Sequence, residues 1–263
     1  MEVAGYIASV LIGLSLGLIG GGGSILTVPV LVYLFGVEPV TATAYSLFIV
    51  GSTSLVGALP KYRQGLIDLK TAIIFGVPSI ITVFATRKFL VPLIPKKVFT
   101  IGDLVITKPI LLMVLFAVLM ITASFSMIRN NKQQSADTAV QSYNYPMIIL
   151  EGIVVGVLTG MVGAGGGFLI IPALVLFCKL PMKKAVGTSL LIIAAKSLIG
   201  FTGDLSNYLM DWKLLLTVTA AAVAGIFIGN QLSNKISGDK LKKAFGWFVL
   251  AMGIYIIIKE LLL

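Results

Sequence analysis

Two clusters of glycine interrupt apolar segments that would otherwise form long helices. The first cluster is the run 20–23, and the second is the run 165–167, which follows Gly163. Glycine costs about 1 kcal/mol per residue relative to alanine inside a helix, so each run should break or unwind its helix. A helix that resumes near Ser24 or Gly167 would present its N-terminus there, with unpaired N–H groups and a partial positive charge. Such a helix end favours an anion.

Lys196 is the one basic residue that the sequence places deep inside an apolar segment, next to Ser197. A charge within hydrocarbon is costly and by default indicates a function, here the neutralisation of an anionic solute. The alternative is a lysine that snorkels to the membrane surface, since Asp204 is close in sequence. The positions that we expect to contact the solute combine glycine N–H groups, hydroxyl groups and this lysine: Gly21, Gly22, Gly23, Ser24, Ser46, Gly165, Gly166, Gly167, Thr188, Ser189 and Lys196.

Other groups that could do chemistry are few. Glu151 lies one turn inside an apolar segment and is a candidate for carrying a coupling proton, although a plain interfacial carboxylate would look the same. The chain has no histidine and Cys178 is its only cysteine. These counts exclude disulfides, thiolate zinc sites and histidine-based acid–base chemistry. Without a catalytic constellation or a metal-ligand cluster, we expect neither an enzyme nor a bound cofactor or metal.

The elements that must hold these groups are membrane spans. Of the 263 residues, 58% are hydrophobic and only 11% are charged, whereas soluble domains are about 25% charged. The net charge of +10 lies mostly in short connections between apolar runs, as the positive-inside rule predicts, and this placement argues against a nucleic-acid partner. We therefore expect a multi-pass protein of the cell membrane. The apolar segments lie near residues 4–35, 41–60, 68–92, 107–128, 146–178, 184–203, 212–234 and 241–261.

The two halves of the chain are copies of one another. A shift of about 143 residues aligns Gly17 to Lys70 with the second half without a gap. The matched pairs include Pro29 with Pro172, Ser46 with Ser189, Thr53 with Lys196, Asp68 with Asp211, and Lys70 with Lys213. The alignment predicts a first repeat over 1–128, a connecting loop over 129–145 and a second repeat over 146–263.

The predicted fold is all-α, with about eight transmembrane helices in two four-helix repeats. The first and fifth spans are broken at the glycine clusters. An even number of spans per copy would give both copies the same orientation. The alternative makes each glycine cluster the tip of a hairpin, so that each copy crosses five times and the repeats are inverted. We favour eight spans because the flanking segments of about 15–17 residues are short for full crossings.

The glycine clusters are part of a longer motif that occurs twice. It reads Gly-x-x-Gly-Gly-Gly-Gly-Ser-x-Leu-x-x-Pro at 17–29 and Gly-x-x-Gly-Ala-Gly-Gly-Gly-x-Leu-x-x-Pro at 160–172. This double motif resembles the sulfite exporter TauE/SafE family of membrane permeases, and the resemblance covers essentially the whole chain. It implies transport of sulfite or small organosulfonates, commonly outward, with the glycine motifs near the substrate path.

These observations together predict a secondary transporter of a small sulfur-containing anion that works by alternating access between the two repeats. Its expected partners are the anionic solute and the lipid bilayer. Transport of another solute, such as a cation held by unwound carbonyl groups and Glu151, stays open. A non-transporting membrane scaffold and a homodimeric assembly also stay open as alternatives.

Overall fold

The computed structural model describes residues 2–101, 104–128, 145–163, 165–176, 178, 180–232 and 238–262. The first half contains α1 (Glu2–Ile19), a 3₁₀ segment η1 (Gly20–Leu26), α2 (Thr27–Tyr33), α3 (Pro39–Arg63) and α4 (Leu69–Ala85). The helix α4 continues through η2 (Thr86–Leu90) and α5 (Val91–Leu93), and an antiparallel hairpin of β1 (Lys97–Ile101) and β2 (Leu104–Thr107) leads into α6 (Lys108–Ile128). The second half contains α7 (Tyr145–Val162), α8 (Gly167–Leu176), α9 (Met182–Thr202), α10 (Trp212–Leu232) and α11 (Gly238–Leu262).

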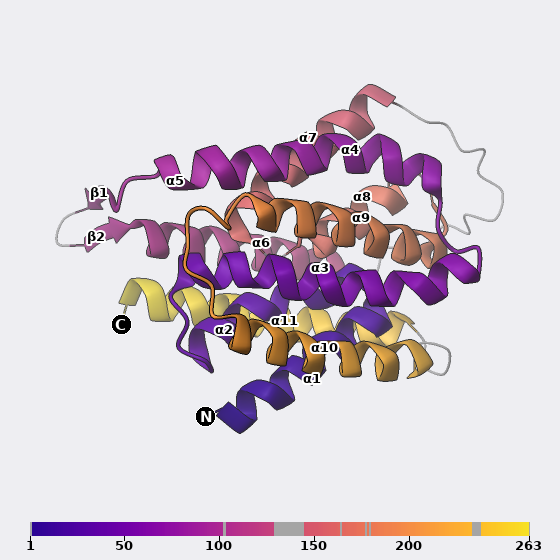
Figure 1. The fold of residues 1–263 in the computed structure, drawn as a ribbon, viewed down its shortest axis with the longest axis horizontal. Coiled ribbons are helices and arrows are strands. Elements are labelled where there is room, and N and C mark those ends of the chain that lie inside the picture. Colours follow the sequence, from indigo (N-terminus) through magenta and orange to yellow (C-terminus); the bar gives the residue numbers. More distant parts are fainter. Residues whose placement is uncertain are drawn as a thin grey trace.

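The helix lengths are those of a multi-pass membrane protein. Within the described residues, five helices are long and apolar enough to cross a bilayer: Pro39–Arg63, Leu69–Leu93, Lys108–Phe125, Met182–Thr202 and Trp212–Leu232. Three shorter apolar helices flank the glycine clusters: Val3–Ile19, Gly23–Tyr33 and Pro146–Val162. Most of the long helices lie along one axis of the molecule (Figure 1). The all-α membrane fold is therefore confirmed, whereas these lengths do not confirm the count of eight spans.

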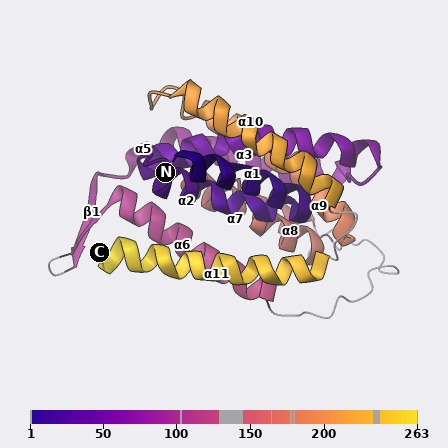
Figure 2. The same ribbon diagram turned by 90° about the horizontal axis from the view of Figure 1, so that it is seen from below.

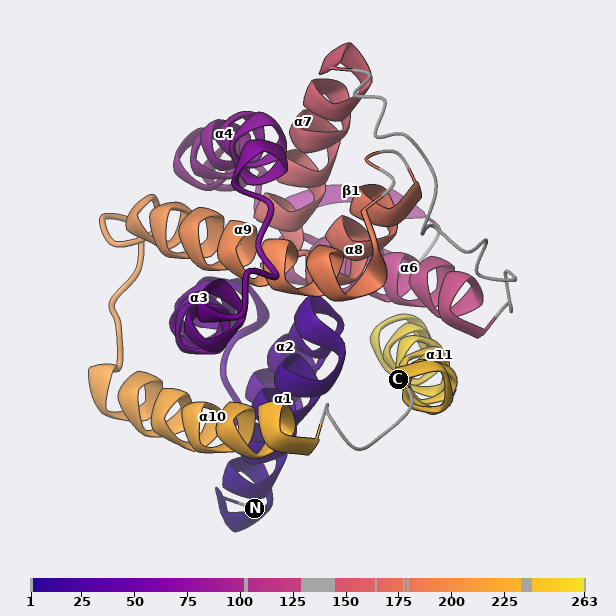
Figure 3. The ribbon, with the colours of Figure 1, turned by 90° about the vertical axis from the view of Figure 1, so that its right-hand side faces the viewer.

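The strongest helix contacts join one half of the chain to the other. The helix α1 packs along α10, and α7 packs along α4. The repeat offset relates α1 to α7 and α10 to α4, so these two contacts are copies of each other. Likewise α3 packs against its own equivalent α9, and α6 lies beside α11 (Figures 2 and 3). The helices of the two halves thus alternate in space.

The equivalent helices α3 and α9 run antiparallel. Gly51 on α3 lies against Leu198 of α9. Nearer the end of α3, Lys61 lies against Gly187, which is near the start of α9. Residue numbers therefore rise along α3 where they fall along α9, and the two halves point in opposite directions. This is the inverted arrangement, so the parallel relation that span counting favours is wrong.

The glycine cluster 20–23 reverses the chain, which explains the inversion. Gly23 lies against Ser15, and the ring of Phe35 meets the ring of Tyr6 edge to face, with their centroids 5.4 Å apart. The segment from η1 to α2 therefore doubles back along α1. A half-length helix on each side of a hairpin tip does not have to cross the bilayer alone. The short length of these segments is therefore no argument against the hairpin.

Both tips contain glycines in a conformation that other residues rarely adopt. Gly20 and its equivalent Gly163 share a φ of 74°, and Gly165 and Gly166 have φ of 64° and 67°. A side chain in this left-handed region meets the backbone, so glycine is the residue that permits each reversal.

The long helix pairs use glycine for close packing. A Cβ on Gly13 of α1 would collide with the carbonyl of Ala222 on α10. In the same seam, Gly17 packs against Gly229. Residue numbers rise together in this contact, so α1 and α10 run parallel. Small residues four apart let two backbones approach closely inside a membrane, and Gly13 and Gly17 have this spacing.

Candidate functional site

The first glycine tip comprises residues 20–23, and the second comprises Gly163 and residues 165–167. The two tips meet inside the molecule. Gly21 and Gly167 approach so closely that a Cβ on either residue would collide with the Cα of the other. Only glycine fits at both positions. The start of α8 in the second half and the 3₁₀ segment of the first half therefore converge on one buried point, as the duplicated motif predicts.

The tips rest against matching faces of α3 and α9. Gly163 lies against Thr43, and Gly165 lies against Val50 of the same helix. Ser46 is one turn from each of these contacts, so the helical period places it on the same face of α3. Its hydroxyl is buried and makes no hydrogen bond with the residues that the structure describes.

The same arrangement recurs in the other half. Gly20 lies against Val186 of α9 and Gly21 lies against Ile193, which places Ser189 beside the first tip. The Ser189 hydroxyl donates to the carbonyl of Val186 at 2.8 Å. The predicted pair is thus divided between the two tips, with Ser46 beside the second and Ser189 beside the first. Of the two, Ser46 has the hydroxyl without a hydrogen-bond partner among described residues.

Two other predicted hydroxyls have structural partners. Ser24 is buried, and its Oγ donates to the carbonyl of Gly21 at 2.8 Å, within the first tip itself. The Oγ of Thr188 accepts a hydrogen bond from the backbone N–H of Asp68 at 2.9 Å. This contact fixes the connection before α4, and its repeat copy is the bond from the N–H of Asp211 to the hydroxyl of Tyr45. The matched aspartates Asp68 and Asp211 also cap their helices.

Lys196 points at the second tip. Its side chain is 1% exposed, and a Cβ on Gly166 would lie 2.8 Å from its Nζ. The ammonium donates to the Oγ of Thr159 at 3.2 Å. Within the described part of the chain, no carboxylate lies within ion-pair distance of it. This burial does not fit a snorkelling lysine, and an ammonium without a counter-ion is costly in such a place.

Ser197, the next residue, adds a hydroxyl to the same tip. It is fully buried, and a Cβ on Gly165 would lie 3.3 Å from its Oγ. The Oγ has no hydrogen-bond partner among the described residues. The helix α9 therefore brings two polar groups to the second tip, the ammonium of Lys196 and the hydroxyl of Ser197, which makes no hydrogen bond with described residues.

Arg87 is a further cation at this tip, and it was not among the residues predicted from the sequence. It is fully buried, and a Cβ on Gly163 would lie 2.5 Å from its Nη2. Its Nη1 donates to the Oγ of Thr43 at 2.9 Å, and its Nε lies 3.5 Å from Oδ2 of Asp204. In the sequence, Arg87 precedes Lys88 near the end of an apolar run and looks like a positive residue of a connection. The repeat offset could have indicated Arg87, because it pairs Arg87 with Asn230, a polar residue inside α10.

With this geometry described, comparison with known proteins gives the family. The family model for sulfite exporter TauE/SafE matches residues 6–256. The chain belongs to the TauE/SafE family. A probable membrane transporter protein of Xylella fastidiosa strain 9a5c is 31% identical over 254 residues, which cover 94% of this chain and 91% of that protein. Another, YdhB of Bacillus subtilis, is 30% identical over 234 residues, which cover 89% of this chain and 91% of YdhB. No solved structure matches.

Membership of the TauE/SafE family makes this chain a multi-pass integral membrane protein of a transporter family. That membership agrees with the expectation of a transporter rather than an enzyme. Among the described residues, no three His, Cys, Asp or Glu side chains are grouped so that they could hold a metal.

The remaining predicted site residue of this TauE/SafE protein, Glu151, lies away from the tips. It is half-buried on α7, and its Oε2 makes no hydrogen bond with described residues. Because it precedes Gly163 by twelve positions on a helix, it lies about 18 Å from the second tip along the axis. The structure therefore does not bring Glu151 to Lys196.

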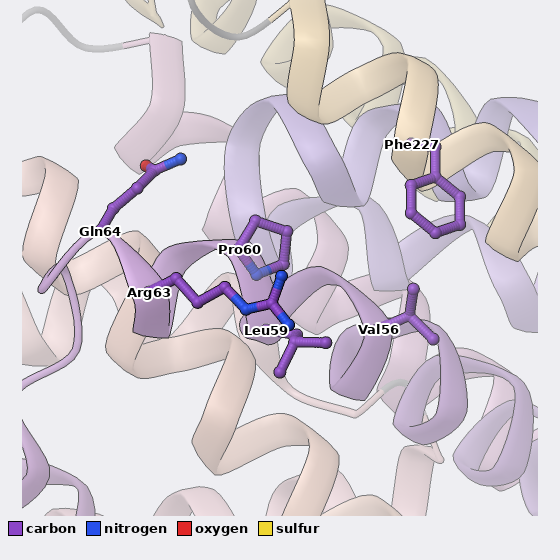
Figure 4. A pocket seen from close by; sticks show the side chains of 6 residues that line it. All are labelled: Val56, Leu59, Pro60, Arg63, Gln64 and Phe227. Carbon is purple, nitrogen blue, oxygen red and sulfur yellow. The ribbon is translucent and has the colours of Figure 1, made fainter.

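A surface pocket of 340 Å³ also lies outside the tip region. It is lined by residues of α3, by Gln64 directly after this helix, and by one residue of α10 (Figure 4). Leu59 and Phe227 in its wall are each 54% exposed, which is expected of apolar side chains that face lipid. The lining residues are Val56, Leu59, Pro60, Arg63, Gln64 and Phe227.

Proposed function

We propose that this protein is a secondary transporter that exports a small sulfur-containing anion, such as sulfite or an organosulfonate. The bound anion lies at the second glycine tip, held by Lys196, by the hydroxyls of Ser197 and Ser46, and by N–H groups at the start of α8. The observation that carries the proposal is the buried Lys196 ammonium beside Gly166, without a carboxylate partner among the described residues. The family description supplies the class of anion.

The physical reason for an anion is charge compensation. A buried ammonium loses its hydration, and one hydrogen bond to Thr159 recovers only part of that loss. Of the first four N–H groups of α8, those of Leu169 and Ile170 donate to the carbonyl of Gly166, so Gly167 and Phe168 are the two residues left to offer N–H groups to a ligand. The helix start adds partial positive charge. An oxyanion accepts hydrogen bonds from the ammonium, from hydroxyls and from N–H groups at once. A cation would be repelled by the ammonium and by the partial positive charge of the helix start.

The inverted halves support alternating access as the transport mechanism. Inverted repeats in transporters place the substrate at their interface near the middle of the membrane, and rocking of one unit against the other opens each side in turn. Here the interface contains the contact of Gly21 with Gly167 and the antiparallel pair of α3 and α9. We propose that the two hairpins and six further helices span the bilayer, with each hairpin counted as two passes.

The test is binding of sulfite, sulfoacetate and taurine to the purified protein in detergent, measured by isothermal titration calorimetry. Lys196→Met should weaken binding of the preferred anion by about 10- to 100-fold, since a hydrogen bond to a charged group contributes about 1.5–3 kcal/mol. Thr53→Val is the matched control, because Thr53 occupies the equivalent buried position in the first half. It should change affinity by less than about threefold.

The two outcomes against the proposal are distinct. Unchanged anion affinity in Lys196→Met would remove Lys196 from the site. A wild-type protein that binds none of the three anions, and that takes up none of them in liposomes, would refute anion transport itself.

A further inference from the structure

Arg87 and Asp204 form a buried ion pair that the proposed function does not yet use. Both side chains are 0% exposed, and Nε of Arg87 faces Oδ2 of Asp204. Arg87 comes from η2, and Asp204 comes from the connection between α9 and α10. Asp204 is also the only fully buried carboxylate among the residues whose burial is described.

The contact within this pair is incomplete. The Nε of Arg87 lies 3.5 Å from Oδ2 of Asp204, whereas charge-assisted hydrogen bonds are about 2.7–2.9 Å long. Neither carboxylate oxygen of Asp204 has a hydrogen-bond partner among described residues, and the same holds for Nε and Nη2 of Arg87. Two buried charges held in this way stabilise each other less than a closed bidentate pair would.

The charged groups around Asp204 come from several elements. Arg87 of η2 and Lys108 at the start of α6 act on it with positive charge. Tyr208 lies in the same connection, and Glu38 before α3 acts on Tyr208 and on Lys108. Burial raises the pKa of Asp204 to about 6, while Arg87 and Lys108 oppose this rise. Any loss of positive charge near Asp204 would therefore raise its pKa further.

The guanidinium of Arg87 lies between Asp204 and the second tip. Its Nε faces Asp204, while its Nη2 lies against Gly163, where the turn into α8 begins. An anion at this tip would compete with Asp204 for one positive charge. Lys196 and Arg87 supply two positive charges at this tip. A dianion such as sulfoacetate together with the Asp204 carboxylate would therefore leave one negative charge uncompensated, which is costly unless one group takes up a proton.

We propose that Asp204 is the proton acceptor of a coupled site, in which the transported anion takes over Arg87 and displaces the carboxylate. The displaced Asp204 then gains one proton from solvent as the anion binds, and it returns that proton when the anion leaves. This inference rests on the proposed anion transport.

The repeat offset indicates that this site occurs once per molecule. The position equivalent to Asp204 is Lys61, and the position equivalent to Arg87 is Asn230. The equivalent pair, Lys61 with Asn230, therefore has neither the carboxylate nor the guanidinium, so one proton should accompany one anion.

The experiment measures proton uptake on anion binding by the full-length protein. Sulfoacetate is the probe because it is fully ionised around neutral pH and takes up no proton itself. Calorimetry in two buffers with different ionisation enthalpies should give about one proton per anion for the wild type at a pH above the pKa of Asp204. Asp204→Asn should bind sulfoacetate with about zero protons. Asp211→Asn, the same change at an exposed helix cap in the same connection, should keep about one.

A second readout does not depend on any variant. Above the pKa of Asp204, the affinity of the wild type for sulfoacetate should fall about tenfold per pH unit. If Asp204→Asn fails to fold because Arg87 loses its partner, the proton uptake and the pH dependence of the wild type decide the question by themselves.

Sulfoacetate binding by the wild type without proton uptake and without this pH dependence would overturn the coupling while leaving anion transport intact. Unchanged proton uptake in Asp204→Asn would also overturn it. A wild type that binds no anion at all would remove the proposed function, and the coupling with it.

Discussion

Replacing Gly21 by alanine should separate the two glycine tips. The added methyl group would collide with the Cα of Gly167, and it would lie 2.8 Å from the carbonyl carbon of that residue. These are backbone atoms, so no rotation of a side chain relieves the contact. The tips must move apart by about 1 Å to restore an ordinary contact distance. Overpacking of this kind costs about 1–3 kcal/mol, and we expect the upper end because both segments are buried.

The assay is thermal unfolding of the purified protein, followed by the fluorescence of its two tryptophans, together with sulfoacetate binding. Gly76→Ala is the matched control, because a Cβ at Gly76 on α4 would meet only Ile192, at 3.8 Å. That change should leave the protein as stable as the wild type, or stabilise it by up to about 1 kcal/mol through helix propensity. Gly21→Ala that is as stable as Gly76→Ala and binds equally well would refute the contact between the tips.

Three further predictions concern topology, charge and symmetry. Single cysteines at Lys97 and at Lys184, in a cysteine-free background, should be labelled from opposite faces of the membrane; labelling from the same face would restore the eight-span arrangement. Lys196→Met should raise the unfolding temperature of the anion-free protein, because loss of an uncompensated buried charge stabilises the fold by roughly 1–3 kcal/mol. An unchanged or lower unfolding temperature would contradict the burial of a charged Lys196. Tyr45→Phe and Thr188→Val should destabilise the protein by similar amounts, about 1–2 kcal/mol each in thermal unfolding, since each removes the acceptor for an equivalent backbone N–H; a large effect of one alone would show that the two contacts are not equivalent.

The sequence alone was sufficient to predict the membrane class and the breaks at the two glycine clusters. Composition indicated the class, and the repeat offset paired Asp68 with Asp211, which occupy equivalent helix caps in the structure. Lys196 could be singled out because it lies between alanine and serine in a long apolar run, where a charge is too costly to be incidental.

The direction of the second half could not be predicted in the same way. Whether a chain continues or reverses after Gly20 depends on the sign of φ at one residue, and glycine adopts both signs about equally readily. The contact between Phe35 and Tyr6 shows that the chain reverses, but it joins residues that are distant in sequence, and no local sequence pattern predicts it. Arg87 escaped notice for a related reason, because its burial depends on α7 and on the α9–α10 connection lying beside it.

The alternation of helices from the two halves has a consequence for biosynthesis. The glycine face of α1, with Gly13 and Gly17, finds its packing surface only on α10, which leaves the ribosome about 200 residues later. Until then the N-terminal hairpin sits in lipid or against the insertion machinery with its seam uncovered. The first half expressed by itself should therefore be a substrate for membrane proteases, and co-expression of the second half as a separate chain should protect it.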